Sequence, residues 1–214
     1  MDATRLVLFD FDGTLADSEA WFSGKLNQIA RHFGFRETGP EERAKLRGLS
    51  SRQIISELGV PVWKLPLIVA HMRRLASREI DHIAPFPWVD DLFTRLSAAG
   101  KTIAIVSSNT EANIHRVLGP ATAHVAAFSA GVSLFGKASR FRSVLERLGV
   151  PAGAAVAVGD EVRDIEAARQ AGVTAVAAGW GFATAEALMA ARPDAFAADA
   201  AALEGLLLGA TIPG

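Results

Sequence analysis

Four short apolar segments, each followed at once by polar or glycine-rich residues, most constrain the fold of this chain. They are rich in Ile, Val, Leu and Ala and span residues 5–9, 102–106, 155–158 and 174–178. A weaker one lies at 195–197. Runs that are short and apolar on both faces are typical of buried parallel strands. Helical patterns that end at a glycine, a common helix stop signal, lie between them at 91–99, 141–148 and 164–171. This alternation predicts an α/β fold, a Rossmann-like parallel sheet flanked by helices.

Residues 16–85 interrupt this rhythm. They contain no good strand pattern, but four helical patterns, at 21–33, 41–46, 52–58 and 64–80. Pro85 and Pro87 then mark the return to the sheet. We therefore expect an all-helical domain at 16–85, inserted into a core domain made of residues 1–15 and 86–214.

Composition excludes several classes of protein. Half of the 214 residues are hydrophobic and 21% are charged, which excludes a disordered chain. The net charge of −1 argues against binding to nucleic acid through bulk charge, and the absence of cysteine excludes disulfides, thiolate metal sites and a cysteine nucleophile. No stretch is apolar enough for a membrane span. We expect a cytoplasmic monomer or homodimer with no nucleic-acid or membrane partner.

Polar residues follow three of the predicted strands, where ligands bind in open parallel sheets. They are Asp10, Asp12 and Thr14 after the first, Ser107, Ser108, Asn109 and Thr110 after the second, and Asp160, Glu161 and Asp164 after the third. Lys137 opens a further predicted helix. Because the carboxyl ends of parallel strands share one edge of a sheet, we expect these side chains to converge there.

Such a group of carboxylates needs compensating positive charge. Mg²⁺ prefers hard oxygen ligands and commonly binds one or two carboxylates together with a substrate phosphate. Lys137 supplies a second positive charge, and Ser107 supplies a hydroxyl next to backbone N–H groups that face the same edge. A phosphate dianion is the ligand that this combination favours.

Asp10 is suited to act as a nucleophile. An aspartate is ionised at neutral pH and forms covalent phosphoryl intermediates in known enzymes. Asp12, two residues further on, is placed to protonate the leaving oxygen and then to take a proton from water. General acid–base help of this kind contributes roughly 10²–10⁴-fold in rate.

Four motifs together resemble those of the haloacid dehalogenase superfamily. They are Asp10-Phe-Asp12-Gly-Thr-Leu-Ala-Asp-Ser18, Val106-Ser-Ser-Asn-Thr110, Phe135-Gly-Lys137 and Val158-Gly-Asp160-Glu-Val-Arg-Asp164. All four occur in the family's order, and the last is most similar to the phosphoglycolate-phosphatase-like branch. Asp12 distinguishes the chain from the family's dehalogenases, which lack an Asp at this position, and favours phosphoryl chemistry.

The resemblance implies a role for each matching residue. Asp10 corresponds to the nucleophile and Asp12 to the acid–base. The implied phosphate-binding residues are Gly13, Thr14, Ser107, Ser108, Asn109 and Lys137, and the implied Mg²⁺ ligands are Asp10, Asp12 through its carbonyl, Asp160 and Asp164, the last directly or through water. The insert at 16–85 resembles the family's small helical cap, which selects the substrate.

The predicted function is Mg²⁺-dependent hydrolysis of a small phosphate monoester, phosphoglycolate-like or a sugar phosphate. Two residues are candidates for contact with the rest of the substrate: Arg47 in the insert and Trp180 in a glycine-flanked loop. Two alternatives remain open. A phosphomutase of the β-phosphoglucomutase type would return the phosphoryl group to a sugar, and a catalytically idle binding protein would share the same scaffold.

Overall fold

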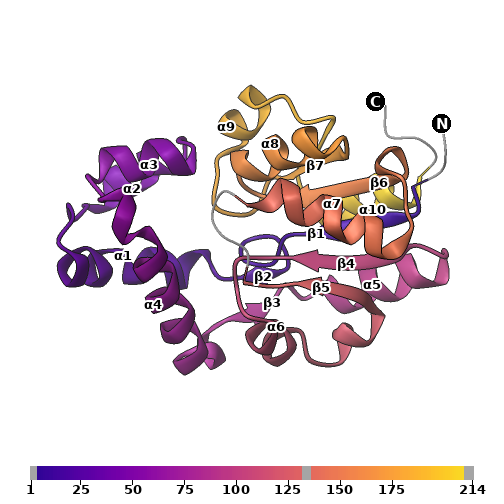
Figure 1. Cartoon of the computed structure of the whole chain (residues 1–214), viewed down its shortest axis with the longest axis horizontal. Helices are drawn as coiled ribbons and strands as arrows, with labels where there is room; N and C mark the ends of the chain where they lie inside the picture. The colour runs from indigo at the N-terminus through magenta and orange to yellow at the C-terminus, as the bar shows by residue number, and fades with distance from the viewer. Residues whose placement is uncertain (1–3, 132–135, 210–214) are drawn as a thin grey trace.

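A computed structural model describes residues 4–131 and 136–209 and contains one six-stranded parallel sheet (Figure 1). Its strands lie in the order β5-β4-β1-β6-β7-β8. They span Leu6–Phe9 (β1), Thr102–Val106 (β4), Val125–Ser129 (β5), Ala155–Gly159 (β6), Thr174–Ala178 (β7) and Ala195–Ala197 (β8). The expected α/β class is confirmed, and the first strand of the chain lies in the middle of the sheet.

Strand register brings the expected polar residues to one level. Phe9 at the end of β1 pairs with Ile105 of β4 on one side and with Val158 of β6 on the other. The residues that follow these strands therefore leave the sheet at the same edge. The backbone N–H of Asp10 still donates to the carbonyl oxygen of Val158, at 2.9 Å, which holds the first turn after β1 against β6.

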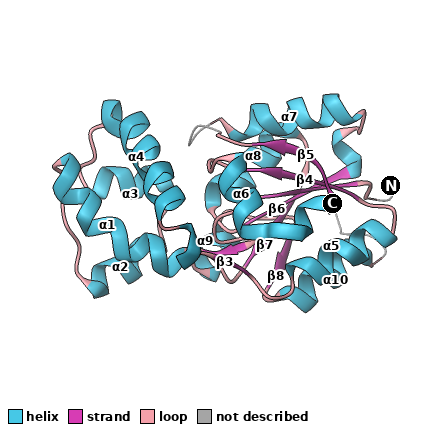
Figure 2. Ribbon diagram, turned by 90° about the horizontal axis from the view of Figure 1, so that it is seen from below, coloured by secondary structure: helices cyan, strands magenta, loops and turns pink. Residues whose placement is uncertain are grey.

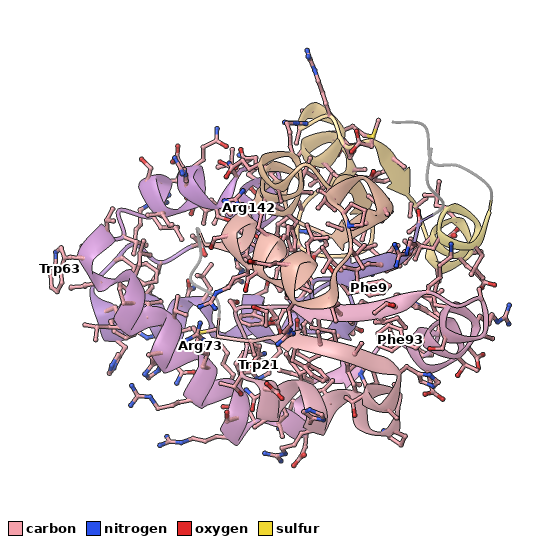
Figure 3. All side chains as sticks on the ribbon, turned by 45° about the vertical axis from the view of Figure 1, so that its right-hand side comes forward. Phe9, Trp21, Trp63, Arg73, Phe93 and Arg142 are labelled. Atoms are coloured by element: carbon pink, nitrogen blue, oxygen red, sulfur yellow. The ribbon has the colours of Figure 1, made fainter. Side chains whose placement is uncertain are left out.

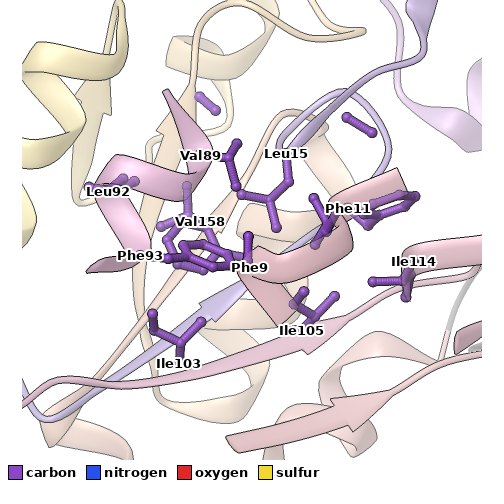
Figure 4. Close-up of a cluster of buried hydrophobic side chains, with 14 of the residues drawn as sticks. Phe9, Phe11, Leu15, Val89, Leu92, Phe93, Ile103, Ile105, Ile114 and Val158 are labelled. Atoms are coloured by element: carbon purple, nitrogen blue, oxygen red, sulfur yellow. The ribbon is translucent and has the colours of Figure 1, made fainter. Parts of the chain in front are cut away.

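Helices cover both faces of the sheet because side chains alternate along β1. Val7 and Phe9 pack with the face covered by α5 (Val89–Ala98), α6 (Glu111–Leu118) and α10 (Ala200–Leu208) (Figure 4). Leu6 and Leu8 pack with the opposite face, under α7 (Lys137–Leu148), α8 (Val162–Ala171) and α9 (Ala185–Ala190). All four β1 side chains are fully buried, as expected for a strand covered on both faces.

The helical insert lies beside the carboxyl edge of the sheet (Figures 1 and 2). Its helices are α1 (Glu19–Phe33), α2 (Pro40–Leu46), α3 (Ser51–Glu57) and α4 (Leu65–Arg78), close to the four patterns in the sequence. The chain crosses between insert and sheet through two short antiparallel strands, β2 (Ala16–Asp17) and β3 (Ala84–Pro85). We call the helices α1–α4 and the segments that join them the cap.

Three core elements were not anticipated from the sequence: β5, α6 and α9. β5, Val-Ala-Ala-Phe-Ser, is as apolar as the central strands, so its sequence held a usable signal, although as an edge strand it buries only Ala127. α6 and α9 are short and follow loop-forming residues. Four 3₁₀ turns complete the described elements, at Val62–Lys64, Ile80–His82, Gly119–His124 and Ala152–Ala154.

Within the described residues, no one helix has both the length and the apolar character needed to cross a membrane. One sharply bent pair, Ser51–Glu57 with Val62–Arg78, meets those criteria by length and composition alone.

The aromatic pair between β1 and α5 should be a main source of stability. Phe93 is fully buried, and its ring centroid lies 5.4 Å from that of Phe9. We expect Phe93→Ala to lower the free energy of unfolding by about 3–5 kcal/mol, because it leaves a cavity beneath the central strand. Denaturant unfolding measures this change. Thr94→Ala is the control, because Thr94 is the exposed neighbour of Phe93. It should alter the free energy of unfolding by less than about 0.5 kcal/mol.

Candidate active site

A buried lysine between two aspartates forms the centre of the site. The Nζ of Lys137 lies 2.7 Å from Oδ2 of Asp10 and 2.7 Å from Oδ1 of Asp164. All three side chains are almost fully buried. Asp10 follows β1, Lys137 is the first residue of α7, and Asp164 lies in the first turn of α8. Three segments far apart in the sequence therefore meet, as the strand-end argument predicts.

Asp160, directly after β6, is fixed by hydrogen bonds to both carboxylate oxygens. The hydroxyl of Thr14 donates to Oδ1 at 2.6 Å, and the backbone N–H of Phe182 donates to Oδ2 at 2.7 Å. Two glycines pass close by: a Cβ on Gly13 would lie 2.3 Å, and one on Gly181 2.2 Å, from Oδ2. The packing thus requires a bare backbone on both sides of this carboxylate.

Burial and charge shift the pKa of every group in this cluster. Burial raises the pKa of Asp10, and the ammonium of Lys137 only partly offsets this effect. Burial and the charge of Asp164 raise the pKa of Asp160 well above its usual range. For Asp164 itself, the nearby charges of Lys137 and Arg163 outweigh burial and lower the pKa. Additional positive charge at this place would favour the ionised carboxylates.

Asp12 faces Asn109. The amide nitrogen of Asn109 donates to both carboxylate oxygens of Asp12, at 3.2 Å each. Asn109 is held in turn by Asn113, whose side-chain nitrogen donates to its Oδ1 at 2.8 Å. Burial, followed by the charge of Asp10, raises the pKa of Asp12 to about 7. A carboxyl group with such a pKa exists in both protonation states near neutral pH.

The segment after β4 folds into a turn that supports Asn109. The fully buried Ser107 accepts a hydrogen bond at its Oγ from the backbone N–H of Asn109, at 3.0 Å. Ser108 is half-buried, and its carbonyl oxygen accepts a hydrogen bond from Nε of Arg73 in the cap. Ser107, Ser108 and Asn109 thus lie at the same edge as Asp10, whereas Phe135 of the third motif lies outside the described residues.

The side chains present fit a divalent cation. Asp10, Asp160 and Asp164 each offer a carboxylate oxygen, and these oxygens lie within 4.8 Å of one another. Oδ2 of Asp10, beside Lys137, accepts no hydrogen bond of good geometry from the described residues. Buried, hard oxygen donors of this kind suit Mg²⁺. The side chain of Asp12 is not part of this set; its expected contribution is a backbone carbonyl.

Arg47 and Trp180 occupy places that the sequence could not define. The guanidinium of Arg47 donates to the carbonyl oxygens of Gly181, at 2.9 Å, and Phe182, at 3.0 Å, so it connects the cap to the loop beside Asp160. Trp180 packs against Trp88, with ring centroids 5.4 Å apart, and its Nε1 donates to the carbonyl of Thr14. Both side chains thus support the loops that surround the site.

Two charged residues at the site, Arg163 and Arg73, were not selected from the sequence, and Glu161 was expected at this edge without an assigned role. Arg163 forms an ion pair with Glu161 beside Asp164, and Ser51 of the cap donates to Oε2 of Glu161 at 2.9 Å. Arg73 reaches the turn after β4 from α4. Arg163 and Glu161 lie inside the fourth motif, so their position in that motif was a usable signal. Nothing in the cap sequence identified Arg73.

The chain is a phosphoric monoester hydrolase, because a hydrolase family model and relatives named phosphoglycolate phosphatases both match it. It belongs to the haloacid dehalogenase-like hydrolase family, whose model matches residues 7–178. The resemblance inferred from the four motifs is thereby confirmed.

Similar proteins support this assignment. The phosphoglycolate phosphatase of Synechococcus elongatus is 34% identical over 192 residues, which cover 89% of this chain and 91% of that protein. The phosphoglycolate phosphatase of Aquifex aeolicus is 25% identical over 185 residues, covering 83% and 86%. A haloacid dehalogenase-like hydrolase structure from Streptococcus pneumoniae shares the fold, with a TM-score of 0.75 at 20% identity over 95% of this chain and 97% of that one.

The close approach of Gly181 to Asp160 can be tested directly. In Gly181→Ala the new methyl group collides with the Asp160 carboxylate, so the side chain must move and phosphatase activity should fall at least roughly tenfold. Phosphate release measures the effect. Gly205→Ala in α10 is the matched control, because its Cβ meets nothing within 4 Å. Equal activities of the two variants would show that the position of Asp160 is not critical.

Proposed function

We propose that the protein is a Mg²⁺-dependent phosphatase that hydrolyses a small phosphate monoester through an aspartyl-phosphate on Asp10. The observation that carries this proposal is the buried contact of Lys137 with Asp10 and Asp164 at the carboxyl edge of the sheet. A nucleophilic carboxylate and a phosphate are both negative, so they approach each other only where positive charge is fixed in advance.

The reaction is assigned to Asp10 and Asp12. The carboxylate of Asp10 attacks phosphorus, a new P–O bond forms, and the ester P–O bond breaks. Asp12 gives its proton to the departing alkoxide oxygen. It then takes a proton from a water molecule that attacks the aspartyl-phosphate, which releases inorganic phosphate and restores Asp10. The pairing with Asn109 holds the Asp12 carboxyl in place for both transfers.

The remaining groups would bind the phosphate and the cation. Lys137, the hydroxyl of Ser107 and the turn at Ser108 and Asn109 are assigned to the phosphoryl oxygens, together with the loop at Gly13 and Thr14. Asp10, Asp160 and Asp164 would hold Mg²⁺, with the carbonyl of Asp12. When bound, Mg²⁺ neutralises charge on the transferring phosphoryl group. Thr14 donates to Asp160, so it also positions a proposed ligand.

The division into domains belongs to the same proposal. We assign catalysis to residues 1–15 and 86–214, and substrate selection to the cap at 16–85, because the β2–β3 pair joins the two parts at these boundaries. Relatives named phosphoglycolate phosphatases support a small free ester as substrate. The near-neutral charge balance is consistent with a cytoplasmic monomer or homodimer that binds neither nucleic acid nor membranes.

The nucleophile can be tested with Asp10→Asn. An amide is a poor nucleophile, so phosphate release from an aryl phosphate in the presence of Mg²⁺ should fall at least roughly a thousandfold. Circular dichroism and thermal unfolding check that the fold is retained. Asp17→Asn, which changes an exposed carboxylate in β2, is the control and should remain active. A rate for Asp10→Asn above about a tenth of wild type would contradict the assignment.

The metal site can be tested with Asp160→Ala. Loss of one carboxylate ligand should raise the Mg²⁺ concentration for half-maximal activity at least roughly tenfold, or abolish activity. A Mg²⁺ titration, with EDTA as the zero point, measures the change. Asp90→Ala removes an exposed carboxylate in α5 and serves as the control. A titration curve for Asp160→Ala that matches wild type would remove Asp160 from the metal site.

A further inference from the structure

A cavity of about 370 Å³ lies between the cap and the core. Its volume falls within the range of ligand pockets, about 300–1,000 Å³. It opens onto the proposed catalytic centre, because Asp12 and Asn109 form part of its wall. Figure 3 shows Arg73 where α4 faces the sheet, whereas Trp63 points outward at the far side of the cap. We call this space the cap chamber.

The walls of the cap chamber are divided by polarity. The core contributes mainly polar side chains: Asp12, Ser108, Asn109, Glu161 and Arg163, with Phe182 as its one aromatic. The cap contributes four polar side chains, Glu19, Ser23, Arg47 and Arg73, and a larger number of apolar ones, such as Phe22, Leu26, Ile54, Ile68, Val69 and Met72. A ligand here would have its polar end at the catalytic centre and its other end among hydrocarbon side chains.

The interior of the cap is only partly filled by its own side chains: Ile29 and Leu58 are buried, but an open space remains beside them. The two apolar clusters of the described core are both built around the sheet, on its two faces. In the cap, Leu26, Ile54 and Ile68 are only half-buried although they point into the same chamber. Apolar surface left open to water is unfavourable, so covering it with an apolar group would stabilise the closed cap.

We propose that the preferred substrate is a phosphate monoester whose alcohol part is a hydrocarbon-rich group that occupies the cap chamber. This inference rests on the proposed phosphatase function, which places the phosphate near Asp10. An apolar cavity of about 150 Å³ holds one benzene molecule, so the chamber corresponds to roughly ten to fifteen carbon atoms. Asp12 lines the chamber and follows Asp10 by two residues, which suits donation to the oxygen that joins the two parts of the substrate.

A strongly polar alcohol part fits the chamber less well. Sugar hydroxyls or a second carboxylate would lose water on entry and would need partners among the cap side chains. The guanidinium of Arg47 is bonded to the carbonyls of Gly181 and Phe182, and Arg163 is paired with Glu161. Of the other polar cap side chains that line the chamber, Ser23 donates to Glu19 and Arg73 donates to the carbonyl of Ser108, and the rest of the described cap wall is apolar. The chamber therefore favours a hydrocarbon group over phosphoglycolate or a sugar phosphate.

Binding of unreactive analogues tests the chamber without turnover. We would titrate the Mg²⁺-loaded protein with n-alkylphosphonates from methyl to octyl in a calorimeter. Affinity should rise about three- to fourfold per added methylene, the factor expected for burial of one CH₂ group. The heat-capacity change of binding should become more negative along the series. Equal affinity for methyl- and octylphosphonate would overturn the proposal.

Two variants on α4 show whether the chamber causes the effect. Val69→Trp places a large ring in the chamber and should reduce the octyl-to-methyl affinity ratio at least roughly tenfold. Leu67→Trp is the matched control on the same helix, because Leu67 is 56% exposed and does not line the chamber. It should keep the wild-type ratio. An unchanged ratio in Val69→Trp would assign the chain-length effect to another surface and overturn the proposal.

Turnover separates this proposal from the proposed function. Wild-type protein should hydrolyse octyl phosphate with a kcat/KM at least roughly tenfold above that for phosphoglycolate. Preference for phosphoglycolate would overturn the hydrocarbon assignment and leave the phosphatase function intact. If no ester released phosphate while phosphonate affinity still rose with chain length, the proposed catalysis would fail and the apolar chamber would stand.

Discussion

The site depends on one buried ammonium shared by two carboxylates. Lys137 begins α7, Asp10 directly follows β1, and Asp164 lies in α8, so the two contacts of one ammonium group fix the relative positions of three elements. Charges this deep are stable only when they are paired, and removing one member of a buried pair commonly costs about 3–5 kcal/mol. The same contact that orders the core therefore places positive charge beside the nucleophile before any substrate arrives.

Small residues around Asp160 complete this rigid arrangement. Gly13, with a φ of +75°, and Gly181 approach the carboxylate so closely that neither position has room for a Cβ. A Cβ on Gly159 would likewise lie 2.5 Å from Asp164. Because these positions carry no side chain, the hydroxyl of Thr14 and the backbone N–H of Phe182 can reach the Asp160 carboxylate. A carboxylate held in this way needs little reorganisation when a cation or a phosphate binds.

Much of the core followed from the sequence because its signals are local. β1, β4, β6 and β7 are covered on both faces, so each is a continuous apolar run, and the chemistry-bearing residues come directly after them. β5 has a similar run, Val-Ala-Ala-Phe, but none of the selected polar residues follows it, so it was not recognised as a strand. The positions of Arg47 and Trp180 depend on how loops distant in the sequence meet. A single segment of sequence does not indicate such contacts. The same limit applies to Arg73, which reaches the core only through the orientation of α4.

The cap shows why substrate choice is harder to infer than reaction type. An apolar stripe on a helix has the same spacing whether it packs against a neighbour or lines an open chamber. In α5, Phe93 fills the space over the sheet and is fully buried; in α4, Ile68 stays half-buried beside a cavity. The difference arises because Ile68 faces the space between cap and core, whose two sides are joined by the β2–β3 pair and by the contacts of Arg47 and Ser51 with the core. The reaction thus depends on a few residues at strand ends, whereas specificity depends on how the cap is placed over them.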